Sequence, residues 1–400
     1  MLQVFWHWLD FMVRWTHVIA GIAWIGSSFY FVHLDSSLKK RDGLPEGAGG
    51  EAWQVHGGGF YHMVKYLVAP ARMPEELTWF KWEAYATWMS GFALLVIVYY
   101  FGASLYMIDP AVLALPPSAA VLISVVGLAG GWLAYNAMCR SPLGQDDIRL
   151  AAAGFAFLVV LAYVFTWIFS GRGAYMQMGA LIGSIMAANV LMIIIPNQKK
   201  VVDALIAGRQ PDPSLGAVAK QRSMHNNYLT LPVLFVMISN HYPLAFASRF
   251  NWLILALVLV VGAIIRHFYN TRHKGLPSPW WTWGVAAVGM ALIIWLSTIK
   301  PADVEAAEAP AEPVTFAMAE EIVLGRCSMC HMAEPVWEGI ASPPKYVMLD
   351  TPEHILAHAQ QIYLQAAHTH AMPPGNVTEI TPEERKVLAL WVESGARGPE

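Results

Sequence analysis

The chain has 400 residues, of which 56% are hydrophobic and only 13% are charged, and it contains 17 tryptophans. An ordinary soluble protein of this length does not carry so apolar a composition, so we expect most of the chain to lie in a lipid bilayer. The formal net charge of −3 gives no sign of the basic surface that nucleic-acid binding requires, and no nucleic-acid partner is expected.

Eight mostly apolar runs are long enough to cross the roughly 30 Å hydrocarbon core of a bilayer as helices. They cover residues 4–32, 84–107, 115–137, 150–170, 176–195, 229–246, 250–268 and 279–298. The sixth is the weakest, because it is interrupted by Pro232, Asn240, His241 and Pro243. The sequence therefore predicts an all-α fold in which residues 1–300 form an eight-helix transmembrane bundle with a catalytic role.

The first run carries ionisable residues along one face. His7, Asp10, Arg14 and His17 recur every three or four positions, which places them on the same side of a helix. Ionisable groups inside a membrane usually mark a site or a path for protons or electrons, and the plainer alternative is an Asp10–Arg14 ion pair that satisfies itself. His17 is the candidate for contact with a buried haem or a substrate.

Three segments on one expected side of the membrane combine imidazoles, amides, cations and flat aromatic rings. His62 lies between the first two runs, His225 opens His225-Asn226-Asn227-Tyr228, and Arg266 and His267 lie at the end of the seventh run. This combination suits a planar, polar, anionic heterocycle, which requires stacking and several hydrogen bonds. An interfacial aromatic belt with basic anchors is the alternative. We predict His62, His225, Arg266 and His267 as catalytic candidates.

Basic residues predict the orientation, because Lys and Arg are retained on the cytoplasmic side. With the N-terminus outside, sixteen cations fall in inside segments, against only Arg172 and Arg249 in outside loops. Eight spans then return the C-terminus to the outer side. The expected location is a bacterial inner membrane, with the N-terminus and the C-terminal domain in the periplasm.

Residues 301–313 are rich in Ala, Glu and Pro and are predicted to form a linker. Cys327-Ser328-Met329-Cys330-His331 follows, with the two thiols and the adjacent imidazole that covalent haem attachment requires. The thiols would form thioethers, and His331 would ligate the iron. A structural zinc site would need further ligands, and the only other cysteine is Cys139, far upstream. A redox-active CxxC motif would be expected in a βαβ setting, which does not surround this one. One covalent haem c is therefore expected.

Met372 is the predicted second ligand of the haem iron. It lies in Thr369-His370-Ala371-Met372-Pro373-Pro374-Gly375, which the prolines and the glycine make a loop. The rival ligands are Met348, His354, His358, His368 and His370. Thr381-Pro382-Glu383-Glu384 then begins a final helix with a capping hydroxyl, Pro in the first turn and Glu at the third position. Residues 314–400 resemble a class I cytochrome c domain.

Over essentially its whole length the chain resembles the membrane-bound, cytochrome c-fused urate oxidases. The segments that carry the resemblance are residues 16–26, 56–66, 79–85, 225–232 and 239–243 and the fused CxxCH domain. The resemblance implies oxidation of urate to 5-hydroxyisourate, with electrons leaving through haem c and no hydrogen peroxide formed. It also implies a downstream respiratory acceptor, such as a soluble cytochrome or a terminal oxidase. It assigns no catalytic residue.

A cytoplasmic substrate and a haem on the outer face would lie about 30 Å apart, too far for one efficient electron transfer. Either a b-type haem held by His17 and His241 lies between them, or urate is oxidised nearer the outer face. Two other classes of protein remain open: a membrane cytochrome that relays electrons from a separate dehydrogenase, and a transporter with a cytochrome tail. A relay needs no substrate pocket, and a transporter would show repeated halves or paired broken helices.

Overall fold

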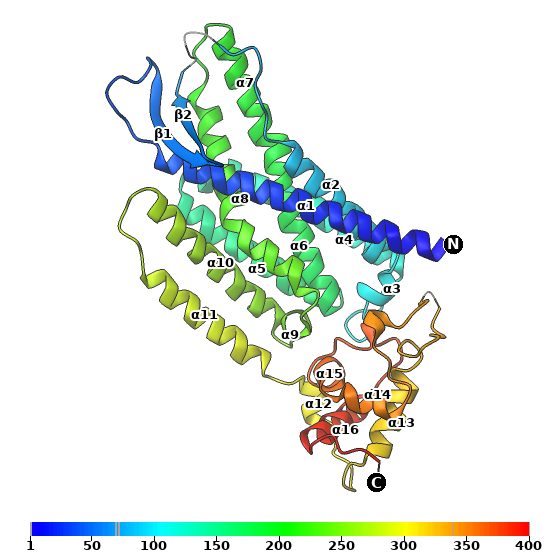
Figure 1. Cartoon of the computed structure of the whole chain (residues 1–400). Helices are drawn as coiled ribbons and strands as arrows, with labels where there is room; N and C mark the ends of the chain where they lie inside the picture. Colours follow the sequence, from blue (N-terminus) through cyan, green and yellow to red (C-terminus); the bar gives the residue numbers. More distant parts are fainter. Residues whose placement is uncertain (1, 69, 71–72, 339, 400) are drawn as a thin grey trace.

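The computed structural model describes residues 2–68, 70, 73–338 and 340–399, and most of these residues are helical (Figure 1). The helices from α1 (Leu2–Ser37) to α11 (Trp281–Ser297) form a bundle. A group of shorter helices, from α12 (Ala302–Ala306) to α16 (Pro382–Glu393), lies at one end of it (Figure 1). The helix α7 (Ile195–Ile206) projects at the opposite end (Figure 1).

Each of the eight apolar runs is helical along most of its length. Between α1 and α11 the elements are α2 (Trp82–Leu94) continued by η1 (Leu95–Tyr100), α3 (Ala103–Tyr106), α4 (Pro117–Arg140), η2 (Pro142–Gln145), α5 (Asp147–Thr166), α6 (Gly171–Ala188) continued by η3 (Asn189–Ile194) and α7, α8 (Pro213–Ser239), α9 (Pro243–Phe246) and α10 (Asn251–His273). In the described part of the chain, five helical stretches are long and apolar enough to cross a membrane. They are Val4–Ser37, Pro117–Arg140, Asp147–Thr166, Gly171–Ile206 and Asn251–His273.

The expected all-α class requires a correction between α1 and α2, where a two-stranded antiparallel sheet forms. Strands β1 (Ala48–His56) and β2 (Gly59–Tyr66) pair so that Trp53 faces His62. Gly57 and Gly58 make the turn with φ of 56° and 80°, a backbone region that glycine adopts without steric cost. The aromatic and β-branched residues on both sides of this turn favour strands.

The core of the bundle is centred on α6, where Leu181 and Ile182 are fully buried. Helices α8 and α10 approach each other closely at Gly262 of α10, where an added Cβ would lie 2.6 Å from the Pro232 ring of α8. Helix α1 differs from this core because many of its apolar side chains point outward; Trp8 and Ile22 are 61% and 67% exposed. Such a surface suits contact with lipid.

The C-terminal group of helices has its own core, which includes Ile355, Leu388 and Trp391. Its elements are α12, α13 (Phe316–Arg326), η4 (Pro344–Tyr346), α14 (Pro352–Ala357), α15 (Ala359–Ile362), η5 (Tyr363–Ala367), η6 (Pro374–Asn376) and α16. The segment expected as a linker begins with α12, whose Val304 is buried. His368 Nε2 lies 2.9 Å from the Ser297 carbonyl at the end of α11, so this group is docked on the bundle.

Candidate functional site

Helix α8 organises the polar interior of the bundle. It begins at Pro213, sixteen residues before the apolar run at 229, with the Asp212 carboxylate accepting from the Ser214 amide at 2.8 Å. Arg222 and the His225-Asn226-Asn227 run therefore lie on a helix that continues into the bundle. Residues three and four apart share a helix face, so Arg222, His225 and Asn226 point to the same side.

Arg222 is buried, with 1% of its surface exposed. Its Nη1 donates to Asn189 Oδ1 at 3.2 Å and its Nη2 to Asn136 Oδ1 at 2.8 Å. Its guanidinium carbon lies 5.0 Å from the centre of the Tyr135 ring. Asn189 opens the π-helical segment η3, a distortion that often occurs at functional sites. A buried cation held by neutral amides keeps its positive charge uncompensated.

His225 joins the same cluster through Tyr135. The Tyr135 hydroxyl lies 2.7 Å from His225 Nδ1 and accepts from Asn189 Nδ2 at 3.1 Å. The hydroxyl hydrogen is thus free to donate to His225 Nδ1, which fixes the neutral tautomer with its proton on Nε2. Asn189 Nδ2 also donates to Asn226 Oδ1 at 2.9 Å. Together Arg222, Asn136, Tyr135, Asn189, His225 and Asn226 form what we call the Arg222 cluster.

A cavity of about 490 Å³ opens beside Arg222, at the end of the bundle that carries α7. It lies among α4, η2, η3, α7 and α8. Its lining contains three cations and no carboxylate, and its polar members are Cys139, Arg140, Ser141, Gln145, Asn197, Lys200, Gln221 and Arg222. The Arg222 cluster therefore borders a space that can admit a small molecule.

Arg266 lies in a second buried cluster, between α8 and α10. Its Nε donates to Asn227 Oδ1 at 3.2 Å and its Nη2 to Asn270 Oδ1 at 3.1 Å. The Phe29 ring of α1 lies 3.8 Å from the guanidinium carbon. His267 Nδ1 approaches the Tyr228 hydroxyl at 3.4 Å, a long and weak contact.

His62 lies apart from both clusters, on the exposed hairpin. Its ring stacks on Trp53 with centroids 4.2 Å apart, and its Nε2 lies 2.6 Å from Glu51 Oε2. The four predicted catalytic residues thus occupy three places in the fold. Sequence reasoning missed Tyr135, Asn136 and Asn189, and Arg222 was only one of the sixteen cations assigned to inside segments. The signal for Arg222 was its spacing of three and four from His225 and Asn226.

Asp10 and Arg14 form the ion pair that was the plainer alternative for the first helix, with 2.8 Å between Oδ1 and Nη2. His17 points toward α2, where its Nδ1 lies 2.9 Å from the Thr87 carbonyl. Nε2 is left for another partner. His241 is exposed, in the turn between α8 and α9.

Cys327, Cys330 and His331 follow α13 directly. All three cysteines of the chain, which lie in its described part, are free thiols. His331 Nδ1 donates to the Val347 carbonyl at 2.9 Å, which orients the ring and leaves Nε2 free to ligate a metal. The described residues contain no group of three or more His, Cys, Asp or Glu that could hold a metal ion. A haem iron requires only two protein ligands, so His331 and the two thiols fit covalent haem attachment.

Both the amide and the carbonyl of Met372 are hydrogen-bonded, which holds its loop in place. The Met372 amide donates to the Gln365 carbonyl at 2.8 Å, and buried Arg385 donates to the Met372 carbonyl at 2.9 Å. All four rival histidines have other partners: His354 lies 2.8 Å from Asp350, His358 Nδ1 lies 2.9 Å from the His354 carbonyl, His368 faces Ser297, and His370 lies 3.4 Å from Asp303. Met372 stays our predicted second ligand.

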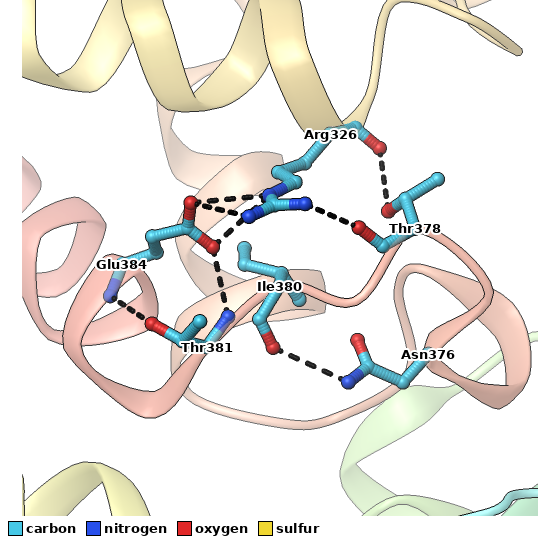
Figure 2. A network of polar contacts seen from close by, with 6 residues as sticks. All are labelled: Arg326, Asn376, Thr378, Ile380, Thr381 and Glu384. Carbon is cyan, nitrogen blue, oxygen red and sulfur yellow. Dashed lines mark hydrogen bonds and ion pairs between the residues drawn. The ribbon is translucent and has the colours of Figure 1, made fainter.

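A polar network joins the helix before the CxxCH motif to the segment after Met372 (Figure 2). Arg326 of α13 makes a forked ion pair with Glu384, with Nη2 to Oε1 at 3.0 Å, and its Nη1 donates to the Thr378 carbonyl at 2.8 Å. Glu384 also completes the predicted capping box of α16, accepting from the Thr381 amide at 2.8 Å. These contacts fix the position of the motif relative to the Met372 loop.

Comparison with known proteins places the bundle in a family. A family model described as urate oxidase N-terminal matches residues 3–297, from the start of α1 to the end of α11. No curated protein and no solved structure matches the chain. Because the family match spans well over half of the sequence, this chain belongs to the urate oxidase N-terminal family.

Proposed function

We propose that this protein is a membrane-bound urate oxidase that forms 5-hydroxyisourate and delivers the electrons, through a covalent haem c, to a respiratory acceptor. The observation that carries the proposal is the presence of two parts in one chain: a bundle of the urate oxidase N-terminal family and a docked C-terminal group with a CxxCH motif. An electron acceptor built into the protein makes the formation of hydrogen peroxide from oxygen unnecessary.

The chemistry balances with water as the source of oxygen. The urate monoanion and one water give 5-hydroxyisourate, one proton and two electrons, and the oxidant is the respiratory acceptor. When bound, haem c would accept electrons singly, held by thioethers to Cys327 and Cys330 and by iron bonds to His331 and Met372. The protein must therefore bind the anion, admit water and remove a proton.

His225 is the residue whose surroundings best suit proton removal. Its Nδ1 faces the Tyr135 hydroxyl at 2.7 Å, so a proton that reaches Tyr135 can pass to His225. A neutral imidazole can accept a proton on its unprotonated ring nitrogen and pass it on, which is the role of a general base. His62, the other candidate base, is already paired with Glu51. Arg266 and His267 remain predicted catalytic residues within the bundle.

We also propose the eight-span topology, with residues 314–400 as a periplasmic cytochrome c domain. Two observations support it: the cations gather in the segments assigned to the inside, and the C-terminal group lies at the opposite end of the bundle from α7 (Figure 1). Reporters fused after Ser141 and after Gly275 should locate to the cytoplasm, and one after Pro301 to the periplasm. A periplasmic signal at Gly275 contradicts the eight-span count.

We propose that a b-type haem held by His17 and His241 carries the electrons across the bundle. His17 fits a ligand in that its Nδ1 is held by Thr87 and its Nε2 is available. Acid acetone should extract haem from the purified full-length protein, while the covalent haem stays attached. His17→Ala should remove the extractable haem, and extracts without haem from the unaltered protein would contradict this assignment.

The test of the function is turnover by the purified full-length protein without oxygen. Urate and an artificial electron acceptor should give 5-hydroxyisourate that contains oxygen from ¹⁸O-labelled water. Because no dehydrogenase is added, the same result excludes the electron-relay alternative. Urate that is consumed only in the presence of oxygen, with hydrogen peroxide formed, would overturn the proposal.

A further inference from the structure

We propose that the cavity beside Arg222 is the binding site for the urate anion, which enters from the end of the bundle that carries α7. The identity of the ligand depends on the proposed function, whereas the preference for a small planar anion depends on the cavity alone.

Arg222 provides an uncompensated charge next to the cavity. It is 1% exposed, both of its hydrogen-bond partners are neutral amides, and its Nε has no partner among the described residues. Burying a cation in this way is costly unless an anion neutralises it. Because Arg222 also lines the cavity, an anion bound there would supply the missing charge.

The mouth of the cavity adds two further cations. Arg140 ends α4 and Lys200 lies on α7, and both are exposed residues of the lining. Their side chains make no ion pair within the described part of the chain. Asp147 of α5 is outside the lining, and its carboxylate accepts from Gln221 at 3.1 Å. The field in the cavity is therefore positive and attracts anions.

The size and the remaining polar groups suit a purine-like ligand better than a bare ion. A volume of about 490 Å³ lies within the range of small-molecule sites, and a heterocycle there leaves room for the water that the reaction consumes. The side-chain amides of Gln145, Asn197 and Gln221 can hydrogen-bond to ring carbonyls and N–H groups.

The cavity is also next to the groups that would move the proton. Arg222 packs over the Tyr135 ring, and the Tyr135 hydroxyl faces His225 Nδ1. An anion held at Arg222 is thus one side chain away from the proton path. The headgroup of an anionic lipid is also negatively charged, but its binding involves no proton transfer through Tyr135 and His225. We therefore assign the cavity to urate.

Cys139 offers a direct test, because it lines the cavity and haem attachment leaves it the only free thiol. The full-length holoprotein is treated with a small maleimide under anaerobic conditions, with or without urate. Urate should slow the alkylation of Cys139, whereas hypoxanthine, a similar heterocycle that is uncharged at neutral pH, should protect much less. If Cys139 does not react in the free protein, Ser141→Cys places a thiol on the same lining.

Lys200→Ala is the test variant, and Lys199→Ala, its exposed neighbour outside the lining, is the matched control. Lys200→Ala should raise the urate concentration for half-protection, and the KM, by roughly threefold to tenfold, with kcat little changed. Lys199→Ala should leave both unchanged. Both variants change exposed residues of α7 and keep buried Arg222, so they are expected to fold.

The outcomes separate this inference from the proposed function. Turnover of urate without protection of Cys139 and without any effect of Lys200→Ala overturns the binding site and leaves the function standing. Protection by urate without turnover retains the site and overturns the function. Protection by phosphatidylglycerol vesicles but not by urate makes the cavity a lipid site and overturns the inference.

Discussion

Tyr135 and His225 lie on different helices, α4 and α8, and are joined by a contact of 2.7 Å between the hydroxyl and Nδ1. The Tyr135 ring also packs against the guanidinium of Arg222. One tyrosine therefore connects the buried cation to the imidazole. Because Asn189 donates to the same hydroxyl, the proton on Tyr135 points toward His225.

Tyr135→Phe keeps the ring beside Arg222 and removes only the hydroxyl. We expect kcat for urate to fall about 100-fold, the low end for loss of a proton-transfer group, with little change in KM. Steady-state kinetics with an artificial acceptor measures both. Tyr163→Phe, on the exposed surface of α5, is the control and should behave like the unaltered protein. An unchanged kcat in Tyr135→Phe would remove His225 from the proton path.

Met372→Ala should leave haem covalently attached while altering the iron. Loss of a soft thioether ligand is expected to lower the reduction potential and to open the iron to added ligands such as cyanide. Arg385 holds the Met372 loop through a backbone carbonyl, so the loop itself should persist. Redox titration checks the potential, and Met348→Ala serves as the control. The same spectrum and potential in Met372→Ala would transfer the role to a neighbouring residue.

Glu384→Ala removes the side-chain half of the capping box of α16 and the ion pair to Arg326 (Figure 2). We expect the C-terminal domain to lose about 1–3 kcal/mol of unfolding free energy, the sum of the lost bond from the Thr381 amide to the carboxylate and of a half-buried ion pair. Chemical denaturation followed by the haem absorbance measures this. Glu383→Ala, in the same turn but exposed, should change stability by less than about 0.5 kcal/mol. Equal effects of the two substitutions would show that the network does not stabilise the domain.

Lys300 and Glu393 link the end of α11 to α16 and should make the docking of the C-terminal domain pH-dependent. The hydrogen bond between them lowers the pKa of Glu393 below its usual 4.5 and raises that of Lys300 above its usual 10.5. Because the pKa of Glu393 is lower in the folded state, its carboxylate stabilises the fold at pH values above the unfolded-state pKa. This stabilisation is lost as the pH falls through the folded-state pKa. Because the pKa of Lys300 is higher in the folded state, its ammonium group stabilises the fold at pH values below the unfolded-state pKa. This stabilisation is lost as the pH rises through the folded-state pKa.

The stability difference between the unaltered protein and Glu393→Gln should therefore be constant from about pH 6 to 9 and disappear in acid. Because the two side chains are 34% and 41% exposed, the difference should stay below about 1 kcal/mol. Lys300→Gln should show the same plateau. Thermal unfolding as a function of pH measures it, and a difference that persists at pH 3 would assign the effect to packing instead.

The apolar runs predicted the positions of the bundle helices, because apolar length is a local property of the sequence. They placed the start of α8 at residue 229, whereas the helix begins at Pro213. The reason is that the first part of α8 is polar, and Arg222 is buried through tertiary contacts, among them those with Tyr135, Asn136 and Asn189. Hydropathy alone assigns such a cation to a loop.

The hairpin was missed for a related reason. Gly57, Gly58 and Gly59 indicate a turn, but strand pairing depends on partners such as Trp53 and His62, which local composition does not identify. In contrast, the capping box at Thr381 was predictable from four consecutive residues, and it is confirmed. The link between Tyr135 and His225 spans ninety positions of the sequence, and no local pattern reports it.

The proposed function requires that electrons from urate reach a haem c in the same chain. The most direct measurement is the absorbance band of the oxidised full-length protein, mixed with urate under anaerobic conditions without any other acceptor. We expect that urate alone reduces the c-type band, that 5-hydroxyisourate forms, and that no hydrogen peroxide appears when oxygen is readmitted. A band that stays oxidised while urate is consumed would contradict it.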